Sequence, residues 1–585
     1  MLVSVYGSAV FGVDAQCITV EVNIDRGIGY HLVGLPDNAV RESNFRIAAA
    51  LKNTGYKLPG KKITLNMAPA DLRKEGSAYD LPLSVGILAA SGQIKAPKVG
   101  DYVLMGELAL DGKIRPIKGA LPIAIQALKD GFKGILLPKE NQREAAIVKG
   151  LDVYGMENLT DVIAFFEGTQ SFSPTVVDTR KAFEQQLKYP EHDFSDVKGQ
   201  ETIKRCMEIA AAGGHNLILI GPPGAGKTML AKRLPSILPP MTLEEALETT
   251  KTHSVVGKIK NRGLISVRPF RSPHHTISDV ALVGGGQYPQ PGEISMAHNG
   301  VLFLDELPEF KRSVLEAMRQ PLEDREVTIS RAKFTVTYPA SFMLVASMNP
   351  SPSGYFNDGK SGSVTPFEMQ RYLGKISGPL LDRIDLHVEV EPVPFEKLSE
   401  TRPAESSASI RSRVTEARKL QTQRIKNTKN THYNAQMSSR QIRKYCSLDQ
   451  DSSALLKSAM EHLSLSARAY DRILKVSRTL ADLAGKDKVD SDHISEAIQY
   501  RSLDREGWLA LAEVYLLFKI NFVERNPKAR SVNPFWSSDA TAYNHADLCS
   551  FGQTQYYFDP LGIKALHGTG VVTVTRHTHQ KILSC

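Results

Sequence analysis

The chain has 585 residues, 42% of them hydrophobic and 23% charged, with a formal net charge of +9, as expected for a globular protein of about three or four domains. No apolar run is long enough to span a bilayer, the first residues lack a signal-peptide pattern, and five scattered cysteines suit a reducing compartment, so we expect a cytoplasmic protein without membrane contact. The mild positive charge permits nucleic-acid binding without requiring it.

Residues 1–167 alternate strand-like and helix-like segments. Cys17–Ile24 alternates polar and apolar residues as a strand does, and Asn38–Lys52 has the spacing of an amphipathic helix. Lys62–Asn66 and Gly134–Pro138 are predicted as further strands. The sequence therefore predicts a mixed α and β domain in this part of the chain.

Two stretches of this domain resemble the proteolytic domain of Lon proteases. They are Glu75–Leu88 and Gly106–Ile117, and Ser77 stands where that family has its nucleophile. Leu121 stands where the resemblance places the partner lysine. A serine without a base is not an activated nucleophile, so we expect a Lon-like domain that is inactive as a protease unless another lysine substitutes.

Residues 168–192 have the polar composition of a linker, and an ATPase core is predicted over 193–395. After a predicted helix at Glu201–Ala212 and strand at Leu217–Ile220, the chain matches G-x-x-x-x-G-K-[ST]. Such a loop wraps backbone N–H groups around phosphates at a helix N-terminus, which predicts ATP binding. The predicted phosphate-binding residues are Gly221, Pro222, Pro223, Gly224, Ala225, Gly226, Lys227 and Thr228.

A second nucleotide motif follows about eighty residues later. The apolar run Val301–Leu304 ends in Asp305 and Glu306. We expect Thr228 and Asp305 to hold Mg²⁺ and Glu306 to polarise the attacking water. Asn349, at the end of another predicted strand, is the candidate sensor that orients this water.

Between these motifs lies a segment rich in glycine, proline and histidine, 268–300. His274 and His275 are adjacent, and neighbouring residues of a strand point to opposite faces, so they are poor ligands for one metal ion. The segment resembles the inserted hairpin of magnesium-chelatase-like AAA+ ATPases. The resemblance implies a loop that projects toward a ring pore and contacts DNA; the alternative is an ordinary surface hairpin.

The same resemblance bears on metal binding. Many relatives have a Cys-Pro-Cys-Gly stretch after the sensor strand, but this chain has Ser351 and Ser353 there and no cysteine between Cys206 and Cys446. We therefore predict no zinc site.

Two arginines are the remaining catalytic candidates. Arg383, in Leu380–Asp385, resembles the AAA+ arginine finger, and guanidinium suits the charge of a transferring phosphoryl group. The alternative is a structural ion pair with Asp382 or Asp385. Residues 396–505 are predicted as a helical lid, in which Arg468 occupies the position of the second sensor arginine. If Arg383 acts on a neighbouring subunit, the protein must form a homo-oligomer.

The tail, residues 506–585, changes character: it holds both tryptophans and shows little helical periodicity. A poorly ordered extension and an altered reading frame both fit this composition.

Residues 1–505 as a whole resemble the ComM/YifB family, the magnesium-chelatase-like AAA+ ATPases with a Lon-like amino-terminal domain. The predicted fold class is therefore α/β, a P-loop AAA+ core with a helical lid after a Lon-like α+β domain. The resemblance implies a ring, a hexamer, that uses ATP and Mg²⁺ to drive branch migration of single-stranded or branched DNA. A chelatase motor that drives metal insertion and a Lon-type protease are the alternatives.

Overall fold

The protein is described by a computed structural model, and its contacts divide the chain into two compact units, Met1–Trp508 and Leu509–Cys585. The structure describes residues 2–180, 183, 192–259, 263–286, 289–331, 334–354, 366–394, 397, 404–425, 432–463, 465–501, 549–551, 554–559, 562–567 and 570–573. Within these residues, no helix combines the length and the apolar character that crossing a membrane requires.

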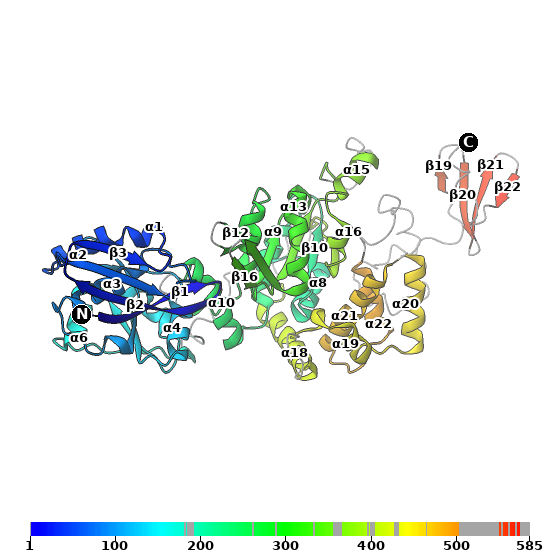
Figure 1. The fold of residues 1–585 in the computed structure, drawn as a ribbon. Coiled ribbons are helices and arrows are strands. Elements are labelled where there is room, and N and C mark those ends of the chain that lie inside the picture. Colours follow the sequence, from blue (N-terminus) through cyan, green and yellow to red (C-terminus); the bar gives the residue numbers. More distant parts are fainter. Residues whose placement is uncertain are drawn as a thin grey trace. The chain divides into compact units, whose positions relative to one another are not determined.

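A seven-stranded mixed sheet forms the amino-terminal domain (Figure 1). Its strands, in spatial order, are β3 (Gly29–Val33), β4 (Lys62–Ala68), β2 (Asp14–Asp25), β1 (Leu2–Phe11), β5 (Tyr102–Leu104), β8 (Gly134–Pro138) and β9 (Asp152–Met156). Every second residue of β2 from Ile18 to Ile24 is buried, as a strand with one face on a core requires. The helices of the amino-terminal domain are α1 (Asn38–Arg41), α2 (Ser43–Asn53), α3 (Asp80–Ala90), α4 (Ala120–Lys129), α5 (Gln142–Ala145) and α6 (Leu159–Glu167). Two short strands, β6 (Glu107–Leu108) and β7 (Ile114–Arg115), pair separately from the main sheet.

The region predicted as an ATPase core, residues 193–395, is built on a five-stranded parallel sheet. The strand order is β11 (Phe270–Arg271), β14 (Val301–Leu304), β17 (Met343–Met348), β10 (Leu217–Ile220) and β18 (Leu386–Glu389). Every residue of β10, β14 and β17 is buried, as in a sheet covered on both faces. The longer helices of this part are α8 (Glu201–Gly213), α9 (Lys227–Ile237) and α10 (Leu243–Val256).

Two helical segments are interrupted. The helix predicted at Asn38–Lys52 divides into α1 and α2 at Glu42, and the helical segment 312–324 divides into α13 (Arg312–Ala317) and α14 (Arg319–Asp324) at Met318. Because Pro321 has no backbone N–H to donate to the carbonyl of Ala317, the second interruption follows from the sequence of this segment.

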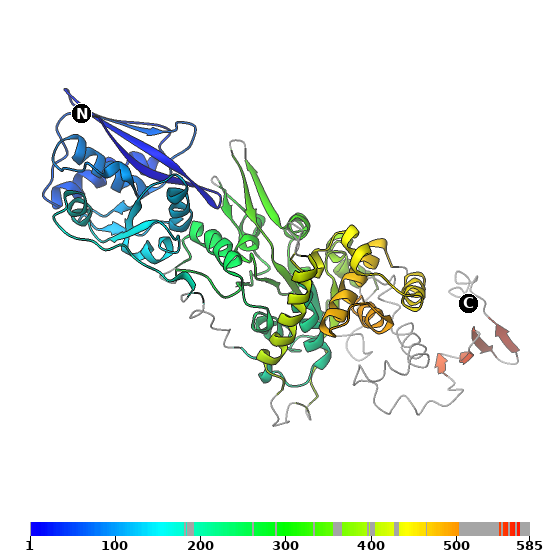
Figure 2. The ribbon, with the colours of Figure 1, turned by 90° about the horizontal axis from the view of Figure 1, so that it is seen from below.

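Short elements and a longer hairpin extend the core. They are α11 (Asp279–Val283), β12 (Gly284–Gly285), β13 (Gln290–Pro291), α12 (Glu293–Met296), β15 (Glu326–Arg331) and β16 (Phe334–Pro339). Figure 2 shows the β15–β16 hairpin projecting from the core. The Tyr338 hydroxyl donates to Pro289 O at 2.7 Å, which fastens this hairpin to the β12–β13 turn.

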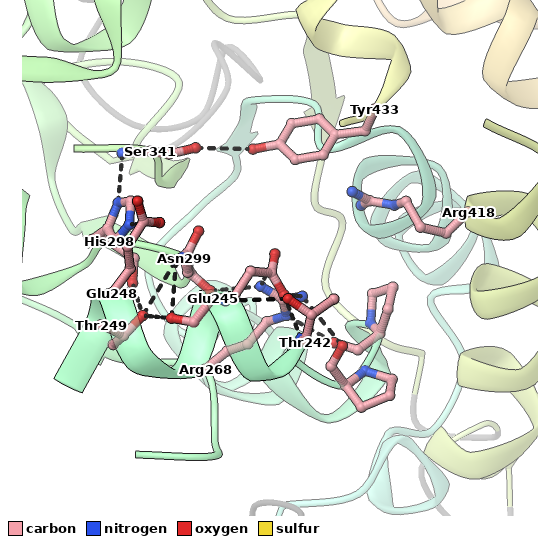
Figure 3. A network of polar contacts seen from close by, with 12 residues as sticks. Thr242, Glu245, Glu248, Thr249, Arg268, His298, Asn299, Ser341, Arg418 and Tyr433 are labelled. Atoms are coloured by element: carbon pink, nitrogen blue, oxygen red, sulfur yellow. Dashed lines mark hydrogen bonds and ion pairs between the residues drawn. The ribbon is translucent and has the colours of Figure 1, made fainter. Parts of the chain in front are cut away.

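The predicted helical lid follows the core and is joined to it by a polar network (Figure 3). Its helices are α18 (Ser407–Ile425), α19 (Ser439–Tyr445), α20 (Gln450–His462), α21 (Ala467–Leu483) and α22 (Ser491–Gln499); α15 (Pro366–Leu373) and α16 (Gly378–Leu381) precede β18. The Tyr433 hydroxyl contacts Arg325 Nη1 at 3.2 Å and Ser341 Oγ at 3.3 Å, and Arg418 covers its ring at 4.4 Å. Burial raises the pKa of Tyr433, but Arg325, Ser341 and Arg418 together hold it below the ordinary value.

The second unit contains one antiparallel sheet of four strands, β19 (Cys549–Phe551), β20 (Thr554–Asp559), β21 (Gly562–His567) and β22 (Gly570–Thr573). The rest of the predicted tail, including both tryptophans, lies outside the described residues.

Candidate nucleotide site

The parallel sheet brings the predicted nucleotide residues to one edge. In the register of neighbouring strands, Ile220 pairs with Met348 and Leu304 pairs with Ala346. The next residues along the chain are Gly221, Asp305 and Asn349, so all three leave the sheet at the carboxyl ends of its strands. Ligands of open α/β sheets bind at such edges.

The predicted phosphate loop has the backbone conformation that its glycines permit. Gly224 and Gly226 have φ of 80° and 88°, a backbone conformation that residues with a Cβ rarely adopt. Helix α9 begins directly afterwards, at Lys227. Lys227 Nζ donates to Gly221 O at 2.6 Å, to Pro222 O at 2.9 Å and to Asn349 Oδ1 at 3.1 Å. Burial lowers the pKa of Lys227, and the charges of Asp305 and Glu306 partly offset this.

The two predicted magnesium ligands are in direct contact. Thr228 Oγ1 donates to Asp305 Oδ2 at 2.7 Å, and Ser347 Oγ donates to the other oxygen of the same carboxylate. Hydroxyl and carboxylate oxygens are the hard donors that Mg²⁺ prefers, so this set fits the ion of a Mg²⁺–ATP complex. Ser347 was not among the predicted residues. The sequence signal that could have identified it is its hydroxyl inside the otherwise apolar strand β17, because a buried polar group needs a hydrogen-bond partner.

Glu306 lies at the same edge in a strained conformation. Its φ of 54° and ψ of 55° are left-handed, which is uncommon for a residue other than glycine and is often found at functional sites. Its N–H donates to Ser347 Oγ at 3.2 Å, and its side chain is 55% exposed. His275 Nδ1 lies 3.9 Å from Glu306 Oε2, a contact that the sequence did not suggest.

The predicted arginine finger pairs within its own chain. Arg383 is 8% exposed, and its Nη2 lies 2.5 Å from Glu323 Oε1. The two aspartates predicted as alternative partners of Arg383 form ion pairs with other arginines. Asp382 pairs with Arg468 at 2.9 Å, and Asp385 pairs with Arg472 at 2.9 Å. Arg468, on α21 of the lid, is 66% exposed at its side chain. Arg468 is therefore connected to Arg383 through its ion pair with Asp382, the residue that directly precedes Arg383.

The serine of the amino-terminal domain has an acidic partner. Ser77 Oγ donates to Glu107 Oε2, whose other oxygen accepts from Arg115 Nη1 at 3.2 Å. Both Ser77 and Glu107 line a cavity of about 400 Å³. Leu121, at the position where the resemblance places a lysine, is fully buried in an apolar cluster that includes Met241 and Ala246.

Known proteins match most of this chain. Family profiles described as "Magnesium chelatase, subunit ChlI", "Subunit ChlI of Mg-chelatase" and "Magnesium chelatase, subunit ChlI C-terminal" match residues 193–398, 20–141 and 404–501. A protein named YifB from Escherichia coli is 46% identical over 86% of this chain and 97% of its own length. Competence protein ComM from Haemophilus influenzae is 44% identical over 86% of this chain and 98% of its own.

A shorter match links the chain to a protease. Lon protease 2 of Bacillus subtilis is 30% identical over 158 residues, which is 24% of this chain and 27% of that protein. With the parallel sheet of the core, these matches confirm the predicted α/β fold class, an AAA+ core of the magnesium-chelatase type with a Lon-related segment. At this identity and coverage, the chain belongs to the family of YifB and ComM.

Proposed function

We propose that this protein is a Mg²⁺-dependent ATPase that assembles into a homo-oligomeric ring, a hexamer, and moves DNA strands by branch migration. The observation that carries the proposal is the meeting of Lys227, Thr228, Asp305, Glu306 and Asn349 at one edge of the core sheet. These side chains suit three tasks of phosphoryl transfer: binding the phosphates, holding Mg²⁺ and activating the attacking water.

The chemistry of the site follows from these positions. With Mg²⁺–ATP bound, Lys227 would turn from Gly221 O and Pro222 O to the β- and γ-phosphates, and Thr228 and Asp305 would hold the ion that neutralises phosphate charge. Glu306 would accept a proton from the attacking water, and Asn349 would orient that water. Arg383 and Arg468 would complete the site at the subunit boundary and the lid.

The DNA-binding part of the proposal rests on the projecting hairpin. Its outward residues are polar: Thr328 and Ser330 on β15, and Thr335 and Thr337 on β16, are exposed. Arg331 is also exposed, and a Cβ on Gly285 would lie only 3.2 Å from its Nη2, so a guanidinium lies beside the glycine loop Gly284–Gly285–Gly286. Hydroxyls, backbone N–H groups and arginine are common partners of phosphate oxygens. The name Competence protein ComM, borne by a relative, agrees with DNA as the substrate.

A strand-exchange assay tests this function. The full chain with Mg²⁺ and ATP should convert a labelled four-way DNA junction into its two duplex products, and Glu306→Gln protein should bind the junction without converting it. Failure of the parent protein to convert any branched or partly single-stranded DNA, under conditions in which it hydrolyses ATP, would contradict the proposal.

A further inference from the structure

One tyrosine joins the predicted helical lid to the core at the base of the projecting hairpin. Arg325 directly precedes β15 and Ser341 follows β16, and the carbonyl of Arg325 accepts from Ala340 N at 2.7 Å, which closes the base of the hairpin. The Tyr433 hydroxyl accepts from Arg325 Nη1 at 3.2 Å and lies 3.3 Å from Ser341 Oγ, toward which Figure 3 shows it directed. A single hydroxyl therefore contacts both ends of the hairpin.

The ring of Tyr433 occupies a defined place between the lid and the core. On the lid side, the guanidinium of Arg418 on α18 lies 4.4 Å from the ring centroid. On the core side, Gly214 has a φ of 68°, and a Cβ on this residue would overlap Tyr433 Cδ2. Gly214 lies just before β10, the strand that leads into the predicted phosphate loop. The ring therefore packs against the start of the proposed nucleotide-binding strand, in space that only a glycine leaves open.

The segment that follows this tyrosine is anchored on α21, the lid helix that carries Arg468. Asn434 is fully buried and opens the short helix η6 (Asn434–Gln436). Its Nδ2 donates to Thr479 Oγ1 at 3.1 Å and to Asp482 Oδ2 at 2.8 Å, and both acceptors belong to α21. The 17 residues of α21 form one continuous helix, so a shift near Thr479 also displaces Arg468 in the first turn.

We propose that Tyr433 is a positioning residue for ATP hydrolysis: its hydroxyl sets the lid on the base of the β15–β16 hairpin and thereby holds Arg468 in place at the nucleotide. The same hydroxyl ties the hairpin, which is the proposed DNA contact, to the lid. This inference rests on the proposed function, because the reaction that Tyr433 serves is the ATP hydrolysis proposed above.

The test is a double-mutant cycle on steady-state ATP hydrolysis by the full chain. Tyr433→Phe removes only the hydroxyl and keeps the ring, so kcat should fall several-fold while KM for ATP stays within about twofold of the parent value. In Arg468→Ala protein the same substitution should leave kcat within about twofold, because the side chain through which the tyrosine acts is gone. A purely structural role of Tyr433 would lower kcat by the same factor in both backgrounds.

Two further variants sharpen the test. Ser341→Ala removes a partner on the core side, so it should also lower kcat, and the double variant with Tyr433→Phe should match Tyr433→Phe alone. Tyr445→Phe is the matched control. Its hydroxyl donates to the carbonyl of Arg424 at 3.1 Å within the lid, and the contacts of the described residues do not join that hydroxyl to the core. We therefore expect the parent kcat in this variant.

The outcomes separate this inference from the proposed function. An unchanged kcat in Tyr433→Phe, the same fold loss in the Arg468→Ala background, or an equal loss in Tyr445→Phe would overturn the inference, even if the parent converts branched DNA. If Tyr433→Phe protein fails to bind a fluorescent ATP analogue, the same cycle is run with Ser341→Ala. A parent that hydrolyses ATP and converts no DNA would overturn the proposed function, while the cycle would still decide the role of Tyr433.

Discussion

Single side chains at the sheet edge carry the proposed reaction, and each is held by a neighbour that the fold supplies. Asp305 takes a hydrogen bond from Thr228 and another from Ser347, which also binds the N–H of Glu306. One serine therefore orients both acidic residues. Because Glu306 makes only a loose side-chain contact with His275, its carboxylate remains available for proton transfer.

Glu306→Gln tests the separation of binding from chemistry. The amide keeps the size of the side chain and cannot accept the proton, so hydrolysis should fall by roughly 10²–10⁴-fold while ATP binding persists. Steady-state ATPase rates and equilibrium binding of a fluorescent ATP analogue measure the two effects. Lys227→Ala is the counterpart and should weaken binding itself; hydrolysis by Glu306→Gln at the parent rate would remove Glu306 from the mechanism.

A buried histidine gives stability a defined pH dependence. His253 on α10 is 9% exposed and bonds through Nε2 with Met296 O at 3.1 Å; burial lowers its pKa to about 4. The unfolded chain binds this proton near pH 6.5, so stability is complete above that pH and is lost as pH falls toward 4.

The loss at this one site is about 2 kcal/mol between pH 7.5 and pH 5. The glutamine variant, His253→Gln, cannot titrate, so its stability should fall less on acidification, as measured by thermal or urea unfolding at both values. Burial also lowers the pKa of His215 and the pKa of His387. Both histidines are present in parent and variant, so their contributions to the pH dependence of stability are equal and cancel in the comparison. Equal pH dependence of parent and variant would contradict the assignment.

At the scale of helices and strands, α10 joins the amino-terminal domain to the core. Ser254 near its end donates to Glu144 and accepts from the N–H of Gly119, while Ala246 packs in the apolar cluster of Leu121. The position at which the Lon resemblance calls for a lysine is thus used for packing. A lysine at Leu121 would place a charged group among the apolar side chains of that cluster.

Ser77→Ala follows from this arrangement. Ser77 bonds with Glu107, and we expect no peptidase activity in the parent and no change in ATP hydrolysis or DNA conversion in the variant. Degradation of an unfolded protein substrate, with and without ATP, is the measurement. ATP-stimulated proteolysis that disappears in Ser77→Ala would show that another group has replaced the lysine.

Sequence patterns predicted the bounds of those strands whose ends are marked by neighbouring residues. The bounds of β10 and β14 agree with prediction, because the apolar run ends at Gly221 in the first and at Asp305 in the second. The partners of Arg383, Leu121 and Glu306 could not be predicted. Glu323, Met241 and His275 lie 31 to 120 residues away from them in sequence, and only tertiary packing brings them together.

At the scale of the whole molecule, the proposed ring predicts that neighbouring subunits share one active site. In a ring, Arg383 would leave Glu323 and reach the nucleotide of the neighbouring subunit, with Asp382 and Arg468 relaying the movement to the lid. The ion pair with Glu323 is then the state of a subunit without a neighbour in place.

Mixing two variants tests the shared site. Arg383→Ala protein should bind ATP and hydrolyse it roughly 10³–10⁵-fold more slowly, the range for arginine fingers. Mixed with Lys227→Ala protein, it should recover part of the activity, because some interfaces then combine an intact Lys227 with an intact Arg383. An Arg383→Ala monomer with full activity would exclude the role in trans.

The most direct test of the account is the ATP hydrolysis rate of the full chain, titrated with single-stranded DNA and with a four-way junction in the presence of Mg²⁺. The account predicts that DNA raises kcat in a saturable manner, that Glu306→Gln abolishes both basal and stimulated hydrolysis, and that chelation of Mg²⁺ does the same. Hydrolysis that is indifferent to every DNA, or that survives the Glu306→Gln substitution, would contradict it.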